Sequence, residues 1–142
     1  MRTFVVALVI IMGQLSIAAE PSKDLPKPLP DTVTKAWADA GATVGWMKYD
    51  NDLGLVFVEK PEAGAVPAFK FAKWKDGVVA KLPVPQEPFG LYLAKTEMQD
   101  AGLKELANFK TLSSLCLCET EVTFDAVDAF QKMLPKCFIF HC

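Results

Sequence analysis

The segment LYLAKTEM at residues 91–98 returns 24 positions later as LCLCETEV at residues 115–122. The same shift continues downstream, where Leu103 aligns with Val127. Apolar residues that recur at a fixed spacing indicate stacked units, because one unit alone cannot bury its own apolar side. The sequence therefore predicts two clear repeats, with a degenerate repeat before them and a half repeat after them.

Each repeat has the pattern of a short strand, a turn and a helix. Leu91 and Leu93 alternate toward a core, as in a strand that is buried on one face. Thr96 follows with a hydroxyl that is able to bond the backbone of the turn. Leu103 and Leu106 then recur at helical spacing. Strands of successive repeats are expected to lie parallel, which gives an α/β fold class.

The pattern Leu112-x-x-Leu115-x-Leu117-x-x-Thr120, with its period of 24, resembles the leucine-rich repeat family. The segment DAGLKELANFKTL at residues 100–112 is similar to the exported repeat proteins of planctomycete bacteria. The resemblance implies a short leucine-rich-repeat solenoid with parallel strands on one face and helices on the other. It also implies a binding scaffold that uses its concave strand face and offers no catalytic residue.

The second repeat departs from the first at two helix positions. Phe124 stands where the first repeat has Asp100, and Ala126 stands where it has Gly102. We therefore expect the second repeat to be tighter or distorted.

The side chains between the inward leucines are expected to line the concave face, because neighbouring residues of a strand point to opposite sides. These positions align as a row of Tyr92, Cys116 and Phe140, with Ser114 and Phe138 beside it. An apolar row rimmed by polar groups is typical of an interface, so these five residues are the candidate contact site. The alternative is that the N-terminal part of the chain, or the chain end, covers the row.

All four cysteines lie between residues 116 and 142. Cys118 and Cys142 are one period apart, so they occupy equivalent positions on neighbouring strands with Cα atoms about 5 Å apart, which a disulfide tolerates. We expect a Cys118–Cys142 disulfide, with Cys137 buried and free. Four unpaired thiols are one alternative, and a zinc site is another. The donors of such a zinc site would come from Cys116, Cys118, Cys137, His141 and Cys142.

Residues 1–30 have the composition of a leader peptide followed by a spacer. Arg2, the apolar stretch after it and the small residues that follow predict a signal peptide over residues 1–18, cleaved after Ala18 or alternatively after Ala19. An uncleaved anchor is the other interpretation. Residues 19–30 are rich in proline and predict an extended linker. We expect a periplasmic or extracellular protein with no membrane contact after cleavage.

Residues 31–66 predict an α-β-β cap module, and residues 67–142 hold the repeats with a C-terminal cap. Asp31 is expected to cap the module's helix. Two strands at residues 43–49 and 53–59 follow as a hairpin, because turn residues separate them. We expect Trp37 and Trp46 to be the core anchors of the module; an exposed aromatic binding site made from them is the alternative.

Charge and motifs limit the function classes. The chain has 15 Lys and Arg against 17 Asp and Glu, a net charge of −2, and its basic residues are scattered. Nucleic-acid binding needs clustered basic residues, so it is not expected. The one histidine, His141, is a poor general base near the end of the sequence, and no nucleophile or phosphate-loop motif is present. We interpret Asp100 and Glu105 as solvated charges.

These observations predict an exported, non-catalytic leucine-rich repeat protein that binds another protein through its concave face. We expect no enzymatic activity, no cofactor and no metal. A structural or self-associating envelope component is the alternative, and a cysteine-based zinc or thiol site is a further one. The sequence leaves the partner's identity and the oligomeric state open.

Overall fold

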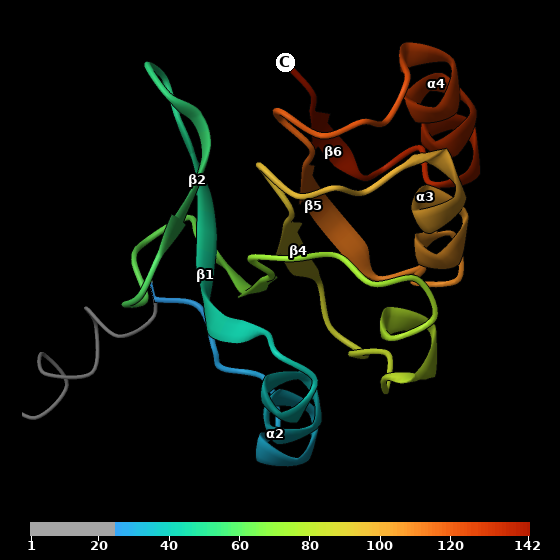
Figure 1. Cartoon of the computed structure of the whole chain (residues 1–142). Helices are drawn as coiled ribbons and strands as arrows, with labels where there is room; N and C mark the ends of the chain where they lie inside the picture. Colours follow the sequence, from blue (N-terminus) through green and yellow to red (C-terminus); the bar gives the residue numbers. More distant parts are fainter. Residues whose placement is uncertain (1–24) are drawn as a thin grey trace, which may run out of the picture.

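A computed structural model describes residues 25–142 and shows a curled, six-stranded sheet with helices packed on one side (Figure 1). The expected signal peptide and the first part of the linker lie outside these residues. The fold is mixed α/β, as predicted. The strands are β1 (Thr43–Asp50), β2 (Gly54–Val58), β3 (Val66–Lys70), β4 (Phe89–Tyr92), β5 (Leu112–Cys116) and β6 (Phe138–Phe140). The helices are α2 (Asp31–Asp39), η3 (Val79–Lys81), α3 (Asp100–Leu106) and α4 (Phe124–Met133).

The sheet has the order β2-β1-β3-β4-β5-β6 and changes its pairing at β3. β1 is antiparallel to both β2 and β3, whereas β3 to β6 run parallel. The predicted hairpin is confirmed as β1 and β2, and the same sheet joins it to the strands of the repeats. The sheet forms a half-barrel, so the hairpin on the left of Figure 1 faces the later strands across the concave side.

The parallel strands pair in the register that the repeat period predicts. Leu91 pairs with Leu115, which pairs with Ile139, and each step is one repeat period. Phe69 pairs with Leu91, which matches the degenerate repeat upstream and its slightly shorter shift.

The turn after each strand is also repeated. The Thr96 hydroxyl donates to the carbonyl oxygen of Leu93 at 2.7 Å, and the Thr120 hydroxyl donates to that of Leu117 at 2.7 Å. The residue before each threonine has a left-handed φ, 63° in the first repeat and 58° in the second. The predicted role of Thr96 in the turn is therefore confirmed and recurs one period later.

The main core lies between the sheet and the helices, with Trp37 of α2 as its largest fully buried side chain. The Trp37 indole stacks on Phe69 with ring centroids 4.4 Å apart and meets Phe89 edge to face. Its Nε1–H donates to the carbonyl oxygen of Pro83 at 2.8 Å, so its polar atom is satisfied. Trp46 is also buried, and the predicted core role of both tryptophans is confirmed.

The start of α2 corrects two expectations. Asp31 is the first residue of the helix rather than its cap; Pro30 is the N-cap and makes no side-chain hydrogen bond. The Asp31 carboxylate still lies in the first turn, where the positive end of the helix dipole favours it. Leu29 was expected in a solvated linker. Its side chain is instead buried in the main core, because removing an apolar side chain from water is favourable.

The two similar segments of the sequence, from residues 91 and 115, have equivalent strands and turns and differ in their helices. α3 has seven residues and α4 has ten. Gly102 of α3 leaves room for Trp74, because a Cβ there would lie 2.7 Å from the Trp74 Nε1 atom. Phe124 at the start of α4 is 73% exposed, and its ring meets that of His141 at 4.7 Å between centroids. In the described part of the chain, no helix has the length and apolar character that a membrane crossing needs.

Candidate interaction surface

The predicted row of Tyr92, Cys116 and Phe140 lies together on the concave side of the sheet. Tyr92 pairs with Cys116, and Cys116 pairs with Phe140, on three neighbouring strands. Leu91 and Leu115 belong to the main core on the helix side. The alignment expected from the repeat is therefore confirmed.

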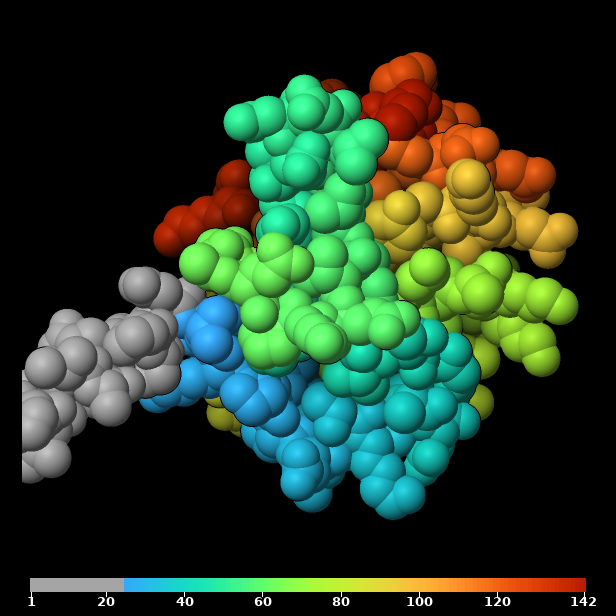
Figure 2. Space-filling model, turned by 90° about the vertical axis from the view of Figure 1, so that its left-hand side faces the viewer, coloured from blue at the N-terminus to red at the C-terminus, as the bar shows by residue number. Residues whose placement is uncertain are grey.

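The β1–β2 hairpin covers most of this row. Cys116 is 2% exposed and belongs to a second, smaller core with Met47 and Leu55 of the hairpin. Phe140 is half-buried against Gly54, where a Cβ would overlap its ring. Figure 2 shows the hairpin, in green, lying over this face. The expectation that Cys116 is an accessible contact residue is corrected, because the N-terminal module covers it.

Tyr92 keeps part of its side chain exposed. Its ring centroid lies 6.1 Å from that of Phe57 on β2, and the Lys70 Nζ atom lies 5.6 Å from the Tyr92 centroid. Burial raises the pKa of the Tyr92 phenol, with smaller contributions from Cys116 and Glu119. Tyr92 is thus a neutral side chain held between an apolar and a cationic neighbour.

Exposed apolar surface remains where the hairpin tip meets β6. Phe138 of β6 is 48% exposed, and Tyr49 of β1 is 56% exposed. Their rings meet edge to face with centroids 5.6 Å apart and an interplanar angle of 85°. Leu53, in the turn that follows β1, is 70% exposed. We call Tyr49, Leu53 and Phe138 the rim patch.

One carboxylate holds the turn that carries Leu53. Asp50 Oδ1 accepts hydrogen bonds from the backbone N–H groups of Asp52 at 2.9 Å and Leu53 at 3.0 Å. Side-chain bonds of this kind fix the backbone of a turn. Leu53 is therefore carried on an ordered turn.

Phe138 was predicted from the sequence as a contact residue, whereas Tyr49 and Leu53 were not. Met47 and Tyr49 are two residues apart on β1, so their side chains share a face. That spacing was the available signal, but using it requires knowing that the hairpin folds over β6. Ser114, the fifth predicted contact residue, is half-buried and pairs with Phe138 in the sheet.

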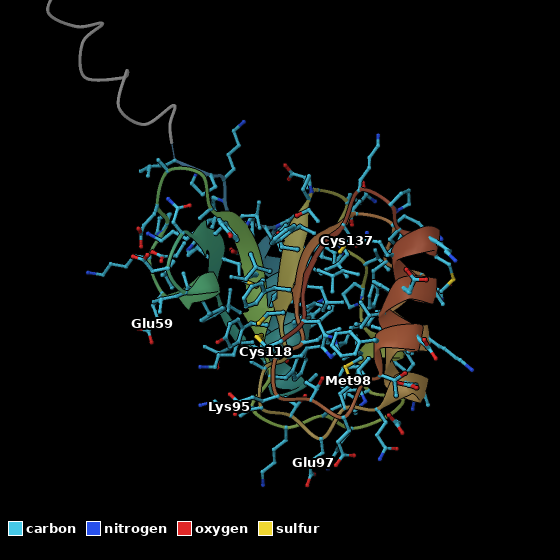
Figure 3. All side chains as sticks on the ribbon, turned by 90° about the horizontal axis from the view of Figure 1, so that it is seen from above. Glu59, Lys95, Glu97, Met98, Cys118 and Cys137 are labelled. Atoms are coloured by element: carbon cyan, nitrogen blue, oxygen red, sulfur yellow. A yellow bond between two sulfur atoms is a disulfide. The ribbon has the colours of Figure 1, made fainter. Side chains whose placement is uncertain are left out.

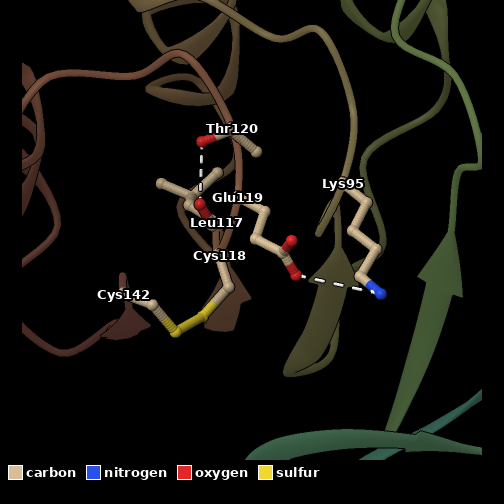
Figure 4. Close-up of a disulfide and its surroundings, with 6 residues drawn as sticks. All are labelled: Lys95, Leu117, Cys118, Glu119, Thr120 and Cys142. Atoms are coloured by element: carbon tan, nitrogen blue, oxygen red, sulfur yellow. Dashed lines mark hydrogen bonds and ion pairs between the residues drawn. A yellow bond between two sulfur atoms is a disulfide. The ribbon is translucent and has the colours of Figure 1, made fainter.

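Cys118 and Cys142 form the predicted disulfide, with Cα atoms 4.7 Å apart (Figure 4). Beside it, the Lys95 Nζ atom lies 3.8 Å from a Glu119 carboxylate oxygen, and both side chains are exposed. Exposed ion pairs add little stability. The disulfide adds a covalent bond where β5 and β6 are already paired. It uses two of the donors that a zinc site would have needed.

The other two cysteines are free and buried, as predicted for Cys137. Figure 3 shows Cys137 on the helix side of the strands and Cys118 on the hairpin side. Burial raises the pKa of the Cys137 thiol to about 12, and burial also raises the pKa of Cys116. Both thiols are therefore protonated at neutral pH. Residues 25–142 contain no group of three His, Cys, Asp or Glu side chains that could hold a metal ion.

Two acidic side chains of α3, interpreted above as solvated, bond to neighbouring turns. Asp100 accepts from the Thr123 backbone N–H at 2.8 Å and from the Thr123 hydroxyl at 2.9 Å. These bonds lower the pKa of Asp100. The Glu105 carboxylate oxygens accept from the Gly77 N–H at 2.9 and 3.1 Å. Both carboxylates join one coil of the chain to the next.

Comparison of the chain with protein-family models, with curated proteins and with solved structures found no match. The functional proposal therefore rests on the residues and geometry of the chain itself.

Proposed function

We propose that this chain is an exported, non-catalytic protein of the leucine-rich repeat type that binds another protein through the rim patch. Strand pairing in steps of one repeat period, from Leu91 to Leu115 to Ile139, supports the repeat architecture. The equivalent turn bonds of Thr96 and Thr120 support it as well. The disulfide supports a place outside the cytoplasm, because disulfides persist in oxidising compartments.

The observation that carries the binding proposal is the exposed contact between Tyr49 and Phe138. In the sheet order, three strands separate β1 from β6, yet the curl brings these two rings together at the surface. Binding is favoured when a partner removes apolar surface from water, and aromatic side chains are enriched in protein interfaces. Leu53 extends the same surface. The rim patch therefore suits a partner with its own apolar patch.

The proposed contact lies at the rim of the concave side rather than at its centre. The hairpin fills the centre with its own side chains, Met47 and Leu55 among them. Phe138 is the most exposed of the five residues predicted from the sequence. Tyr92, Ser114 and Phe140 are half-buried and lie farther from solvent. These three residues therefore add little exposed surface to the rim patch.

Site-specific photo-crosslinking tests this proposal. The full chain, with p-benzoylphenylalanine in place of Phe138, would be produced in its source organism and irradiated. Position 124 is the matched control, because Phe124 is the same residue type and is 73% exposed. We expect a covalent adduct with a distinct protein from position 138, and none of that adduct from position 124.

A second variant separates recognition from chance proximity. Leu53→Ser in the position-138 background should reduce the adduct severalfold while the far-ultraviolet circular dichroism spectrum stays the same, because Leu53 is largely exposed. An adduct between two copies of the chain would instead support the self-associating alternative. The same adducts from both positions, or no adduct from position 138, would contradict the proposal.

A further inference from the structure

A cavity of about 330 Å³ lies between the end of the α2 helix and residues 71–79, which follow β3. Its walls come from the end of α2, the residues after β3 and the start of η3. Figure 1 shows α2 at the lower end of the view and β6 at the upper end, so the cavity is separate from the rim patch. Ligand cavities start at about this size and often lie where two structural units meet.

The floor of the cavity is apolar and held in place. Phe71, Trp74 and Val79 line it with buried side chains. The Trp74 Nε1–H donates to Asp76 Oδ1 at 2.7 Å, and the edge of the indole rests on Gly102. The ring is therefore fixed before any ligand arrives, which reduces the entropy lost on binding.

Small residues create the empty volume above this floor. Ala40, Gly41 and Ala72 line the cavity, and no atom lies within 4 Å of the position a Cβ would take at Gly41. The backbone at Gly41 has φ of 105°, a conformation that other residues rarely adopt. The opening therefore follows from the way α2 ends.

Two lysines supply positive charge at the edge of the cavity. Lys73 and Lys75 line it and are exposed. Within residues 25–142, neither has an Asp or Glu oxygen within 4.0 Å, whereas Lys35 and Lys132 each pair with a carboxylate. The adjacent carboxylate, that of Asp76, accepts a hydrogen bond from the Trp74 indole N–H. The ammonium groups of Lys73 and Lys75 are thus available to an anion.

We propose that this cavity binds an aromatic monocarboxylate. The aromatic body would lie against Phe71 and Trp74, and the carboxylate would face Lys73 and Lys75. The volume suits about two fused six-membered rings at the packing density of protein interiors. A cationic ligand would be repelled by the lysines, and a neutral ring would gain no charge interaction. This site is independent of protein binding at the rim patch.

Titration with 2-naphthoate tests the site on the full chain. The indole N–H signal of Trp74, assigned with a Trp74→Phe variant, would be followed by nuclear magnetic resonance. We expect a saturable shift with a Kd on the order of 1 mM or tighter. The neutral amide 2-naphthamide has nearly the same shape and should bind about fivefold more weakly, because it lacks the charge that pairs with the two exposed lysines.

Variants locate the binding. Lys73→Gln with Lys75→Gln should weaken 2-naphthoate about fivefold. Lys60→Gln with Lys136→Gln, two exposed lysines elsewhere that also have no ion pair within residues 25–142, should leave the Kd unchanged. Ala72→Trp should fill the cavity and abolish the shift while unperturbed signals elsewhere report an intact fold. The absence of a saturable shift up to about 10 mM 2-naphthoate, ten times the expected Kd, would overturn the proposal. Equal affinity for the amide, equal losses in the two lysine pairs, or full binding by the Ala72→Trp variant would overturn it as well.

Discussion

Cys118 and Cys142, one repeat period apart in the sequence, lie with their Cα atoms 4.7 Å apart and share a disulfide. Just before them, the Leu117 N–H donates to the carbonyl oxygen of Phe140 at 2.8 Å, which continues the pairing of β5 with β6. The covalent bond therefore follows the register of the sheet. It fixes the short last strand, β6, to the coil before it.

Loss of this disulfide should destabilise the protein. Cys142→Ser should lower the free energy of unfolding by about 3.5 kcal/mol, the loop-closure value for a sequence separation of 24 residues. Urea unfolding at neutral pH without reductant measures it. A strong reductant should lower the stability of the unmodified chain by a similar amount and leave the variant unchanged. An unmodified chain that is indifferent to reductant would argue against the disulfide.

The free thiols should be unreactive until the chain unfolds. Burial raises the pKa of Cys137 to about 12, so almost no thiolate is present at about pH 8. Iodoacetamide should therefore modify neither Cys116 nor Cys137 in the folded protein and both in denaturant, as read by intact mass and peptide mapping. Rapid labelling of either residue in the folded protein would contradict the burial of these two thiols.

The same thiol makes stability fall at alkaline pH. The folded-state pKa of Cys137, about 12, lies above its ordinary value of 9.0. Between these values the folded state keeps a proton that the unfolded state has lost, so the free energy of unfolding decreases as pH rises. Cys137→Ala should flatten this part of the pH profile, measured by urea midpoints. A profile as steep as that of the unmodified chain would rule out this source.

Asp100 should contribute to stability at neutral pH and lose its contribution in acid. Its pKa is lowered from 3.8 by hydrogen bonds from Thr123, so the contribution is present above that value and disappears as pH falls through the folded-state pKa. Asp100→Asn should lower the urea midpoint at neutral pH and flatten its decline toward about pH 2. Glu97→Gln, at an exposed carboxylate outside the helices, is the control and should change neither. Identical profiles for the two variants would refute the role of Asp100.

Replacing Gly102 with alanine should lower the stability of the protein, the reverse of what helix propensity alone predicts. Gly to Ala within a helix ordinarily stabilises by about 1 kcal/mol. Here the added Cβ would lie 2.7 Å from Trp74 Nε1, so we expect Gly102→Ala to destabilise by about 1 to 3 kcal/mol. In a Trp74→Leu background most of this cost should vanish, which a double-mutant cycle from urea unfolding measures. Additive effects of the two changes would show that the contact with Trp74 is not the cause.

The local parts of the fold were predictable because they depend on residues close in sequence or one period apart. The alternation of Leu91 and Leu93 and the spacing of Cys118 and Cys142 define strand faces and register without any knowledge of the rest. The hairpin followed from the turn residues between its strands. Trp37 was expected in the core because a large aromatic lies on the apolar face of its helix.

The candidate site was predicted only in part because it depends on where the hairpin lies. The row of Tyr92, Cys116 and Phe140 was aligned correctly, but the curl of the sheet that covers Cys116 depends on contacts between distant strands. Tyr49 reaches Phe138 through that same curl. The partners of Asp100 and Glu105 were missed because an exposed carboxylate gives no sequence signal for the backbone N–H it will meet.

The turn held by the Asp50 carboxylate has a consequence for how the protein can change over evolution. The backbone of the turn is fixed by Asp50, whereas the side chain of Leu53 is 70% exposed and belongs to neither buried core cluster. Substitutions at Leu53 can therefore alter the chemistry of the surface without disturbing the interior that Met47 and Leu55 complete. The tip of the hairpin can thus change its binding chemistry at little cost to folding.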